Sequence, residues 1–179
     1  MLIVESRDID QYSHEAASFV NIAARARVPL AVSEDAEIVM FRAEIGGEEH
    51  FAVLIGDGAN SDTPLVRLHS QCITGDILGS LKCDCGDQLQ AAMQLMADSG
   101  GGILVYLAQE GRDIGLLNKM RAYALQDNGL DTVDANHALG FDTDERLFLP
   151  AARILQALDV SKIQLITNNP DKISQLEQH

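Results

Sequence analysis

The apolar positions in the first part of the chain recur at helical spacing. Within residues 9–27, Phe19, Ile22 and Ala23 fall on one helical face, and Pro29 follows the segment. Because proline ends a helix and the spacing matches a period of about 3.6 residues, the pattern predicts a helix over residues 9–27.

The next segments alternate apolar and polar side chains, which is the period of a strand. Residues 37–44 and 50–55 predict two strands, and the glycines at 46–47 predict a hairpin turn between them. Residues 57–64 are rich in glycine, asparagine, serine and aspartate, so they predict a loop. Residues 65–70 predict a third strand.

After the third strand and a polar stretch, helical and strand periods alternate. The predicted elements are helices at 87–98, 115–127 and 150–158, strands at 102–107 and 162–167, a turn at 168–170 and a final helix after it. The helix at 115–127 is expected to bury one apolar stripe, formed by Leu117, Met120, Ala124 and Leu125.

This order of elements predicts an α/β fold in which helices cover the faces of a layered mixed sheet. Antiparallel N-terminal strands lead into a half where strands and helices alternate, and residues 1–179 read as a single domain without repeats or linkers. Ligands in such folds bind at the carboxyl ends of strands. The polar loops at 109–112 and 167–170 leave strands there and are the first candidates for ligand contacts.

The composition narrows the classes of protein that the chain can belong to. The 179 residues carry a net charge of −14, which argues against nucleic-acid binding because a phosphate backbone requires a basic face. No apolar run is long enough to span a membrane, and the N-terminal residues lack the pattern of a secretory signal. Clustered reduced thiols then predict a cytoplasmic protein.

The three cysteines of the chain, Cys72, Cys83 and Cys85, lie close together in sequence. Three thiolates predict a zinc site with one coordination position left open, which is typical of catalytic zinc. His69 could close the site as a structural fourth ligand, and buried structural thiols are a third reading. The polar surroundings of Cys83 and Cys85 favour the metal site.

Basic residues are scarce, and several fall beside the candidate loops. A guanidinium binds phosphate oxygens in a bidentate manner, so this group could hold an anionic substrate, although about half of it is expected at the surface. The group consists of Arg67, Arg112, Lys119, Arg121, Arg146 and Lys172. The acidic segment 142–146 is either a solvated turn or the source of a carboxylate that accepts a proton and holds an arginine.

A series of short motifs closely resembles GTP cyclohydrolase II, the zinc enzyme that opens riboflavin biosynthesis. The resemblance covers about residues 57–173, while residues 1–50 match the family poorly. The motifs are Arg67-Leu68-His69-Ser70-Gln71-Cys72, Thr74-Gly75-Asp76, Cys83-Asp84-Cys85-Gly86, Gln109-Glu110-Gly111-Arg112, Ile114-Gly115-Leu116, Lys119, Tyr123-Ala124-Leu125-Gln126, Asp131-Thr132, Ala135-Asn136, Asp144-Glu145-Arg146 and Thr167-Asn168-Asn169-Pro170.

The resemblance implies a substrate, two metal ions and a set of binding residues. Cys72, Cys83 and Cys85 match the zinc ligands, and magnesium is implied on the triphosphate. Water activated at the zinc attacks C8 of the guanine ring, which opens and loses formate. The residues that match GTP contacts are Arg67, Leu68, His69, Ser70, Gln71, Gln88, Glu110, Gly111, Arg112, Thr132, Thr167 and Lys172.

The resemblance also implies catalytic roles. Asp144 matches the proton acceptor, and Arg146 matches a proposed nucleophile that attacks the α-phosphorus and expels pyrophosphate. Arginine is protonated in proteins, so an electrostatic clamp on the phosphates is the alternative role. Tyr123 matches a tyrosine near the zinc. The resemblance further implies a homodimer.

Two departures from the family pattern leave alternatives open. Gln71 stands where the family usually has glutamate, and the chain stops at His179 where the family continues into a further strand and tail. Loss of that strand would expose a sheet edge and apolar surface. The expected activity is the full cyclohydrolase reaction; the alternatives are a degenerate homologue that binds guanine nucleotide or releases only pyrophosphate, and a non-catalytic zinc-binding subunit.

Overall fold

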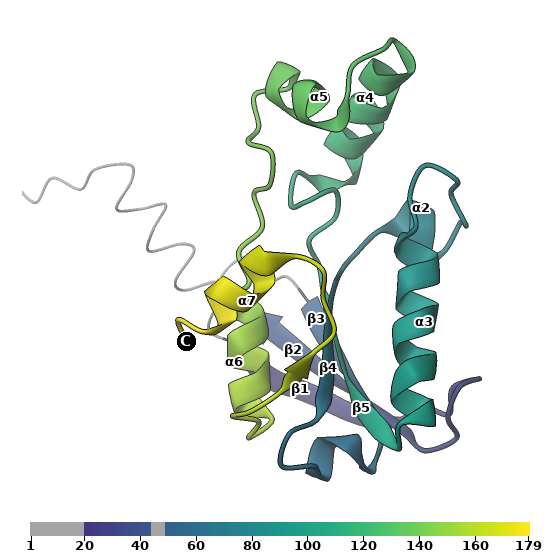
Figure 1. Ribbon diagram of the computed structural model, residues 1–179, viewed down its shortest axis with the longest axis vertical. Coiled ribbons are helices and arrows are strands. Elements are labelled where there is room, and N and C mark those ends of the chain that lie inside the picture. Colours follow the sequence, from purple (N-terminus) through teal and green to yellow (C-terminus); the bar gives the residue numbers. More distant parts are fainter. Residues whose placement is uncertain (1–19, 44–48) are drawn as a thin grey trace, which may run out of the picture. The chain divides into compact units, whose positions relative to one another are not determined.

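The computed structural model describes residues 20–43 and 49–179 (Figure 1). The chain divides into two compact units. The sheet unit contains the described residues up to His69 together with residues 92–107 and 148–179. The thiol unit contains residues 70–91 and 108–147, and it includes all three cysteines.

One mixed sheet organises the sheet unit. Its strands are β1 Val20–Arg27, β2 Ala36–Ala43, β3 Glu49–Gly56, β4 Leu65–Ser70, β5 Gly101–Leu107 and β6 Gln164–Leu165. They lie in the order β1-β2-β3-β5-β4-β6. Strands β1, β2, β3 and β5 pair in antiparallel fashion, whereas β4 and β6 are parallel. This arrangement confirms the predicted α/β fold with antiparallel N-terminal strands.

Helices connect and cover these strands. They are η1 Asp57–Asn60, α2 Ile73–Asp76, α3 Cys85–Asp98, α4 Gly115–Asp127, α5 Thr132–Ala138, α6 Leu149–Ala157 and α7 Pro170–Leu176. The helices predicted at 87–98, 115–127 and 150–158 and the final helix are therefore confirmed. Within the described residues, no helix combines the length and apolar character needed to cross a membrane.

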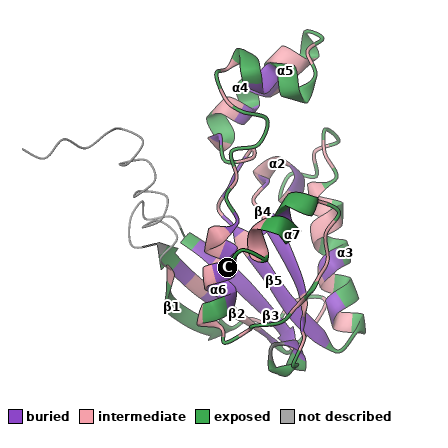
Figure 2. Cartoon of the chain, turned by 60° about the vertical axis from the view of Figure 1, so that its left-hand side comes forward, coloured by how far each residue is buried: buried purple, intermediate pink, exposed green. Residues whose placement is uncertain are grey.

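The core of the sheet unit lies between one face of the sheet and helix α6. Figure 2 shows the buried residues concentrated along the central strands. Apolar side chains alternate along each strand, so every second residue faces α6 and the intervening ones face the other side. The cluster against α6 comprises Val39, Phe41, Ala52, Leu54, Val66, Leu68, Ile103, Val105, Leu107, Phe148, Ala151, Ile154 and Leu155. By the same alternation, Arg67 and His69 point to the opposite face.

The helix predicted over residues 9–27 is wrong in its second part. Residues 20–27 form strand β1, which pairs with β2 from Val20↔Ala43 to Arg27↔Glu37. Most side chains of β1 are exposed, and the apolar spacing at Ile22 and Ala23 does not distinguish a helix from an edge strand. Hydrogen bonding to β2 therefore decides the local structure. Residues 9–19 and the turn predicted at 46–47 lie outside the described residues, but the two strands flanking that turn pair as predicted.

The buried stripe predicted for α4 is also wrong. Leu117 is 66% exposed, and Met120 and Ala124 are exposed as well, while Leu125 is half-buried. The buried residues of α4 are Lys119 and Ala122. The inward face of this helix therefore carries a charged side chain, which an analysis of apolar spacing cannot detect. The strand predicted at 162–167 is shortened to Gln164–Leu165.

Candidate functional site

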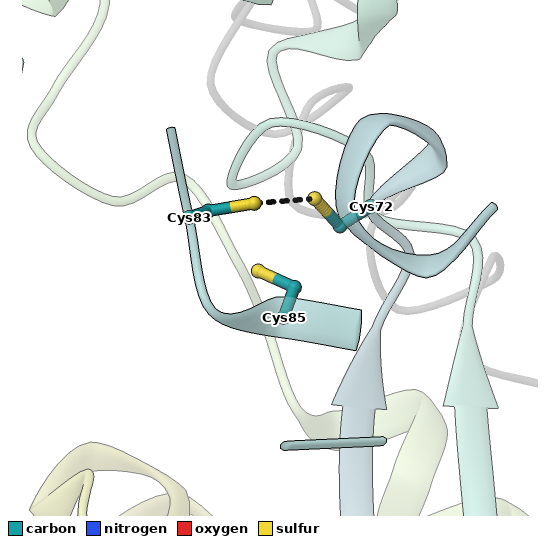
Figure 3. Close-up of side chains that lie close together, drawn as sticks. All are labelled: Cys72, Cys83 and Cys85. Carbon is teal, nitrogen blue, oxygen red and sulfur yellow. Dashed lines mark hydrogen bonds between the residues drawn. The ribbon is translucent and has the colours of Figure 1, made fainter. Parts of the chain in front are cut away.

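The three cysteine thiols converge in the thiol unit (Figure 3). Their sulfur atoms all lie within 4.8 Å of one another, and the Sγ atoms of Cys72 and Cys83 are 3.6 Å apart. Cys72 is the N-cap of the short helix α2, and Cys85 is the first residue of α3. The loop between the two helices supplies Cys83 and brings the sulfur atoms together.

Two glycines permit this convergence. A Cβ atom on Gly75 would lie 2.9 Å from the Sγ of Cys83 and 3.2 Å from the Sγ of Cys72. A Cβ atom on Gly86 would collide with the main-chain oxygen of Gly75. The backbones of α2 and of the start of α3 can therefore approach closely only because both residues lack a side chain.

The charge states of the thiols favour a bound cation. Burial alone would raise the pKa of Cys72, but hydrogen bonds from Lys119 and Thr74 outweigh burial and lower it. Burial and the neighbouring thiols Cys72 and Cys83 raise the pKa of Cys85. Three thiolates at this distance repel one another unless a positive ion lies between them. Thiolate donors in this number fit a soft ion such as zinc, with one coordination position left for water or substrate.

A buried ion pair lies against the thiols. The Nζ atom of Lys119 donates to the Sγ of Cys72 at 3.0 Å and to Oε1 of Glu110 at 2.7 Å. The other carboxylate oxygen of Glu110 accepts from the main-chain N–H of Ile73 at 2.7 Å. Burial lowers the pKa of Lys119, but its bonds to Cys72 and Glu110 outweigh burial and raise it. Lys119 is therefore charged where it meets the sulfur.

Asp144 and Arg146 form a second ion pair in the same unit. The Nε of Arg146 donates to Oδ1 of Asp144 at 2.8 Å, and its Nη2 donates to the other carboxylate oxygen. Burial would raise the pKa of Asp144, but the guanidinium of Arg146 lowers it overall. The remaining nitrogen of Arg146 lies 3.4 Å from the Oγ of Ser70. Gln109 fixes Ser70 in turn, because its Oε1 accepts from that hydroxyl at 3.1 Å while its amide nitrogen donates to the carbonyl of Leu147.

The loop between β5 and α4 has an unusual backbone. Gly111, Arg112 and Asp113 all have positive φ, at 65°, 61° and 76°. For the last two residues this conformation is strained, and such strain clusters at functional loops. Two bonds hold it: the Nη1 of Arg112 donates to the carbonyl of Thr143 at 2.9 Å, and the N–H of Glu145 donates to the carbonyl of Arg112.

The other predicted site residues of the thiol unit have local partners. The ammonium groups of Lys82 and Lys119 lie 5.2 and 5.7 Å from the ring centre of Tyr123. The amide of Gln88 donates to Asp84, beside two of the cysteines. Thr132 begins α5 and accepts from Gln126. Gln71 is half-buried beside Cys72.

The sheet unit holds the remaining predicted contacts. The Nη1 of Arg67 donates to the carbonyl of Ile166, and Lys172 donates to the carbonyl of Leu68 at 2.8 Å. The side chain of Leu68 is fully buried in the core, so any ligand contact from it would use the main chain. His69 is stacked on Tyr106 with ring centres 5.4 Å apart. Thr167 accepts from the N–H of Asn169 at the start of α7.

Burial separates the six basic residues that the sequence places together. Arg67, Lys119 and Lys172 are buried, whereas Arg121 is exposed, and the other two are half-buried. Sequence reasoning missed the contact of Lys119 with sulfur and the packing of Gly75 on the thiols. The family motif contained both residues, but neither apolar spacing nor composition could assign them a position relative to the cysteines.

Comparison with known proteins gives a consistent result. The sequence profile of the family described as GTP cyclohydrolase II matches residues 21–179, which extends upstream of the motif-bearing segment 57–173. The chain is similar to proteins named GTP cyclohydrolase-2 from Azospirillum brasilense, at 50% identity over 98% of this chain, and from Vibrio parahaemolyticus, at 50% identity over 87%. A protein of the same name from Neisseria meningitidis is 54% identical over 75% of this chain. The chain spans 46% of the first relative, 80% of the second and 68% of the third.

Proposed function

Because the chain belongs to the GTP cyclohydrolase II family, we propose that it hydrolyses GTP in the first step of riboflavin biosynthesis. The imidazole ring opens at C8, and the products are formate, pyrophosphate and a ring-opened diaminopyrimidine. The observation that carries this proposal is the convergence of three sulfur atoms within 4.8 Å of one another. Such a donor set suits a catalytic zinc ion better than a structural one.

The cysteines Cys72, Cys83 and Cys85 would hold the zinc ion. When bound, zinc supplies Lewis acidity that activates water near neutral pH for attack at an electron-poor carbon. The residues around the thiols bind and orient the substrate against that position. In the thiol unit, nucleotide contacts are proposed for Glu110, Gly111 and Arg112, on the strained loop after β5, and for Ser70, Gln71, Gln88 and Thr132. In the sheet unit, Arg67, Leu68, His69, Thr167 and Lys172 are proposed as contacts from their match to the family motifs alone.

For Arg146, the ion pair with Asp144 supports the electrostatic role. A carboxylate with a lowered pKa keeps the guanidinium protonated, and a protonated nitrogen has no lone pair for attack on phosphorus. We therefore assign Arg146 to binding the charged phosphate oxygens while a water molecule attacks the α-phosphorus and pyrophosphate leaves, and we assign Asp144 to orienting Arg146. In this proposal magnesium accompanies the triphosphate, Tyr123 lies near the reacting ring, and the active species is a homodimer.

The test is a product assay on metal-analysed protein with GTP and magnesium. Formate, pyrophosphate and the diaminopyrimidine are followed together in the wild type and in Cys83→Ser. We expect about one zinc ion per wild-type chain and all three products. Cys83→Ser is expected to lose zinc and formate release while it still binds a guanine nucleotide. Leu81→Ser, at a fully exposed position of the same loop, is the matched control and should resemble the wild type.

Other outcomes point to the alternatives. Formate release by metal-free Cys83→Ser would refute the zinc-dependent reaction. Pyrophosphate without formate from the wild type would favour a degenerate homologue, for which Gln71 is the specific observation because its amide cannot take up a proton. In that case Gln71→Glu should raise turnover, and an unchanged rate would remove Gln71 as the cause.

A further inference from the structure

The charged side chain of Lys119 is buried, which requires interactions that offset the cost of removing its charge from water. It is 8% exposed on helix α4, and its ammonium donates to a sulfur atom and to a carboxylate. Lysine is rarely buried unless it is paired, because removing the charge from water is costly. The carboxylate of Glu110 accounts for the pairing but not for the second bond, to the Sγ of Cys72 at 3.0 Å.

The carboxylate of Glu110 holds the ammonium of Lys119 beside the sulfur of Cys72. Glu110 accepts from Lys119 through Oε1 and from the N–H of Ile73 through Oε2, both at 2.7 Å. Ile73 directly follows Cys72, so a single carboxylate ties the ammonium to the backbone that carries the sulfur. The N–H of Cys72 itself donates to Asp76 at 3.0 Å. Glu110 therefore holds the ammonium, and Glu110 and Asp76 together hold the backbone that carries the sulfur.

We propose that Lys119 is a positioning residue that acts through Cys72 on the metal ion. A charge-assisted N–H···S hydrogen bond withdraws electron density from the thiolate, so the sulfur donates less to the metal. Three thiolates carry more negative charge than a divalent ion can neutralise, and such a site would be a weak Lewis acid without a compensating cation. Lys119 supplies that cation. This inference rests on the proposed zinc site.

The experiment replaces zinc with cobalt and measures the thiolate-to-metal charge-transfer band in the near ultraviolet. Lys119→Met keeps most of the side-chain volume and removes the charge and the donor. An electron-rich thiolate gives up an electron more easily, so we expect the band of Lys119→Met to move to longer wavelength. In the zinc-loaded protein, kcat for formate release should fall about 10- to 100-fold.

Two further variants separate tuning of the metal from loss of structure. Lys119→Arg keeps a charged donor and should restore most of the band position and of kcat. Arg121→Met removes a positive charge from the exposed face of the same helix and should leave both unchanged. An unshifted band in folded, cobalt-loaded Lys119→Met would overturn the proposal. A wild-type protein without any charge-transfer band would overturn the zinc site itself, and this inference with it.

A measurement on the wild type covers the case in which Lys119→Met does not fold. In protein loaded with ¹¹³Cd, the hydrogen bond predicts a scalar coupling between cadmium and the ammonium protons of Lys119, transmitted through the sulfur of Cys72. Observation of the coupling supports the proposal. Its absence from an assigned, slowly exchanging ammonium resonance would refute it.

Discussion

The imidazole of His50 is buried in strand β3, with 1% of the residue exposed. Burial lowers its pKa below the ordinary value of 6.5, because the charged ring would be removed from water. In the unfolded chain the same ring takes up a proton at a higher pH than in the folded protein. The free energy of unfolding is therefore highest above the unfolded pKa of His50, and it falls as the pH drops from the unfolded pKa to the lower folded-state pKa.

We expect His50→Phe to reduce the acid sensitivity of the protein. In the wild type, this one proton lowers the free energy of unfolding by up to ~1.4 kcal/mol per pH unit below about pH 6.5. Urea unfolding between about pH 7.5 and about pH 5.5 measures the slope. His137→Phe replaces an exposed histidine and should keep the wild-type slope. Equal slopes in His50→Phe and the wild type would contradict the assignment.

Single residues also show how far the sequence predicts the site. The cysteine cluster was predictable, because three thiols close together in a chain without other cysteines favour a shared metal-binding site. The contact between Lys119 and Cys72 was not, since the two residues are 47 positions apart and belong to different helices. A charged side chain carries no periodic signal that says whether it faces water or a thiol.

At the scale of elements, the short helix η1 packs directly on the start of β5. A Cβ atom on Gly58 would collide with the main-chain nitrogen of Gly102. Gly58 lies inside η1, and Gly102 lies in the central part of the sheet order, between β3 and β4. The loop after β3 can therefore close over the sheet only while this position lacks a side chain.

Gly58→Ala is expected to lower the free energy of unfolding by about 3 kcal/mol, because main-chain atoms cannot move aside as a flexible side chain could. Gly100→Ala provides the comparison: Gly100 has φ of 88° and open space around its Cβ position. That variant should cost only about 1 kcal/mol, from backbone strain alone. Denaturant unfolding measures both. A loss in Gly58→Ala no larger than in Gly100→Ala would show that η1 moves away freely.

Apolar spacing predicted some helices and strands correctly but failed for strand β1 and for the buried face of helix α4. Helices α3 and α6 were predicted because their buried faces are apolar, whereas α7 was predicted from the turn and the proline at its start, and its buried residue is Lys172. Strand β1 was mistaken in part for a helix, because an exposed edge strand owes its structure to its hydrogen-bonded neighbour. Helix α4 was located correctly, but its buried face was not, since that face carries Lys119.

At the scale of the whole molecule, the apolar core and the thiols belong to different units. The core cluster consists of sheet and α6 residues of the sheet unit. The cysteines belong to the thiol unit. A metal ion held by these cysteines would therefore organise a part of the chain that contributes no side chain to that cluster.

Removal of the metal should accordingly loosen only one unit. After chelation, hydrogen exchange is expected to accelerate in α2 and the first turn of α3, while β2, β3 and β5 keep their protection. Far-ultraviolet circular dichroism should change little, and added zinc should restore the slow exchange. Loss of protection in both units together would instead favour a structural zinc ion and a non-catalytic subunit.

The division of the chain into two units is the feature that the composition predicts least. The net charge of −14 argues against nucleic-acid binding, but it does not indicate that the few basic residues divide between two units. The sequence reads as one α/β domain because strands and helices alternate without a linker. The thiol unit is formed by the long segments 70–91 and 108–147, which follow β4 and β5. The length of a segment does not reveal that it forms a compact unit.

The missing side chain of Gly75 should make this position look like a catalytic one in a genetic screen. In a scan of every substitution, scored by growth of a host whose flavin supply would depend on the proposed activity, position 75 should tolerate change as poorly as the cysteines. Nearby Gly79, whose Cβ position meets nothing within 4 Å, should accept asparagine. Such a scan would rank Gly75 with the cysteines, although its whole contribution is the volume it leaves for the side chains of Cys72, Cys83 and Cys85.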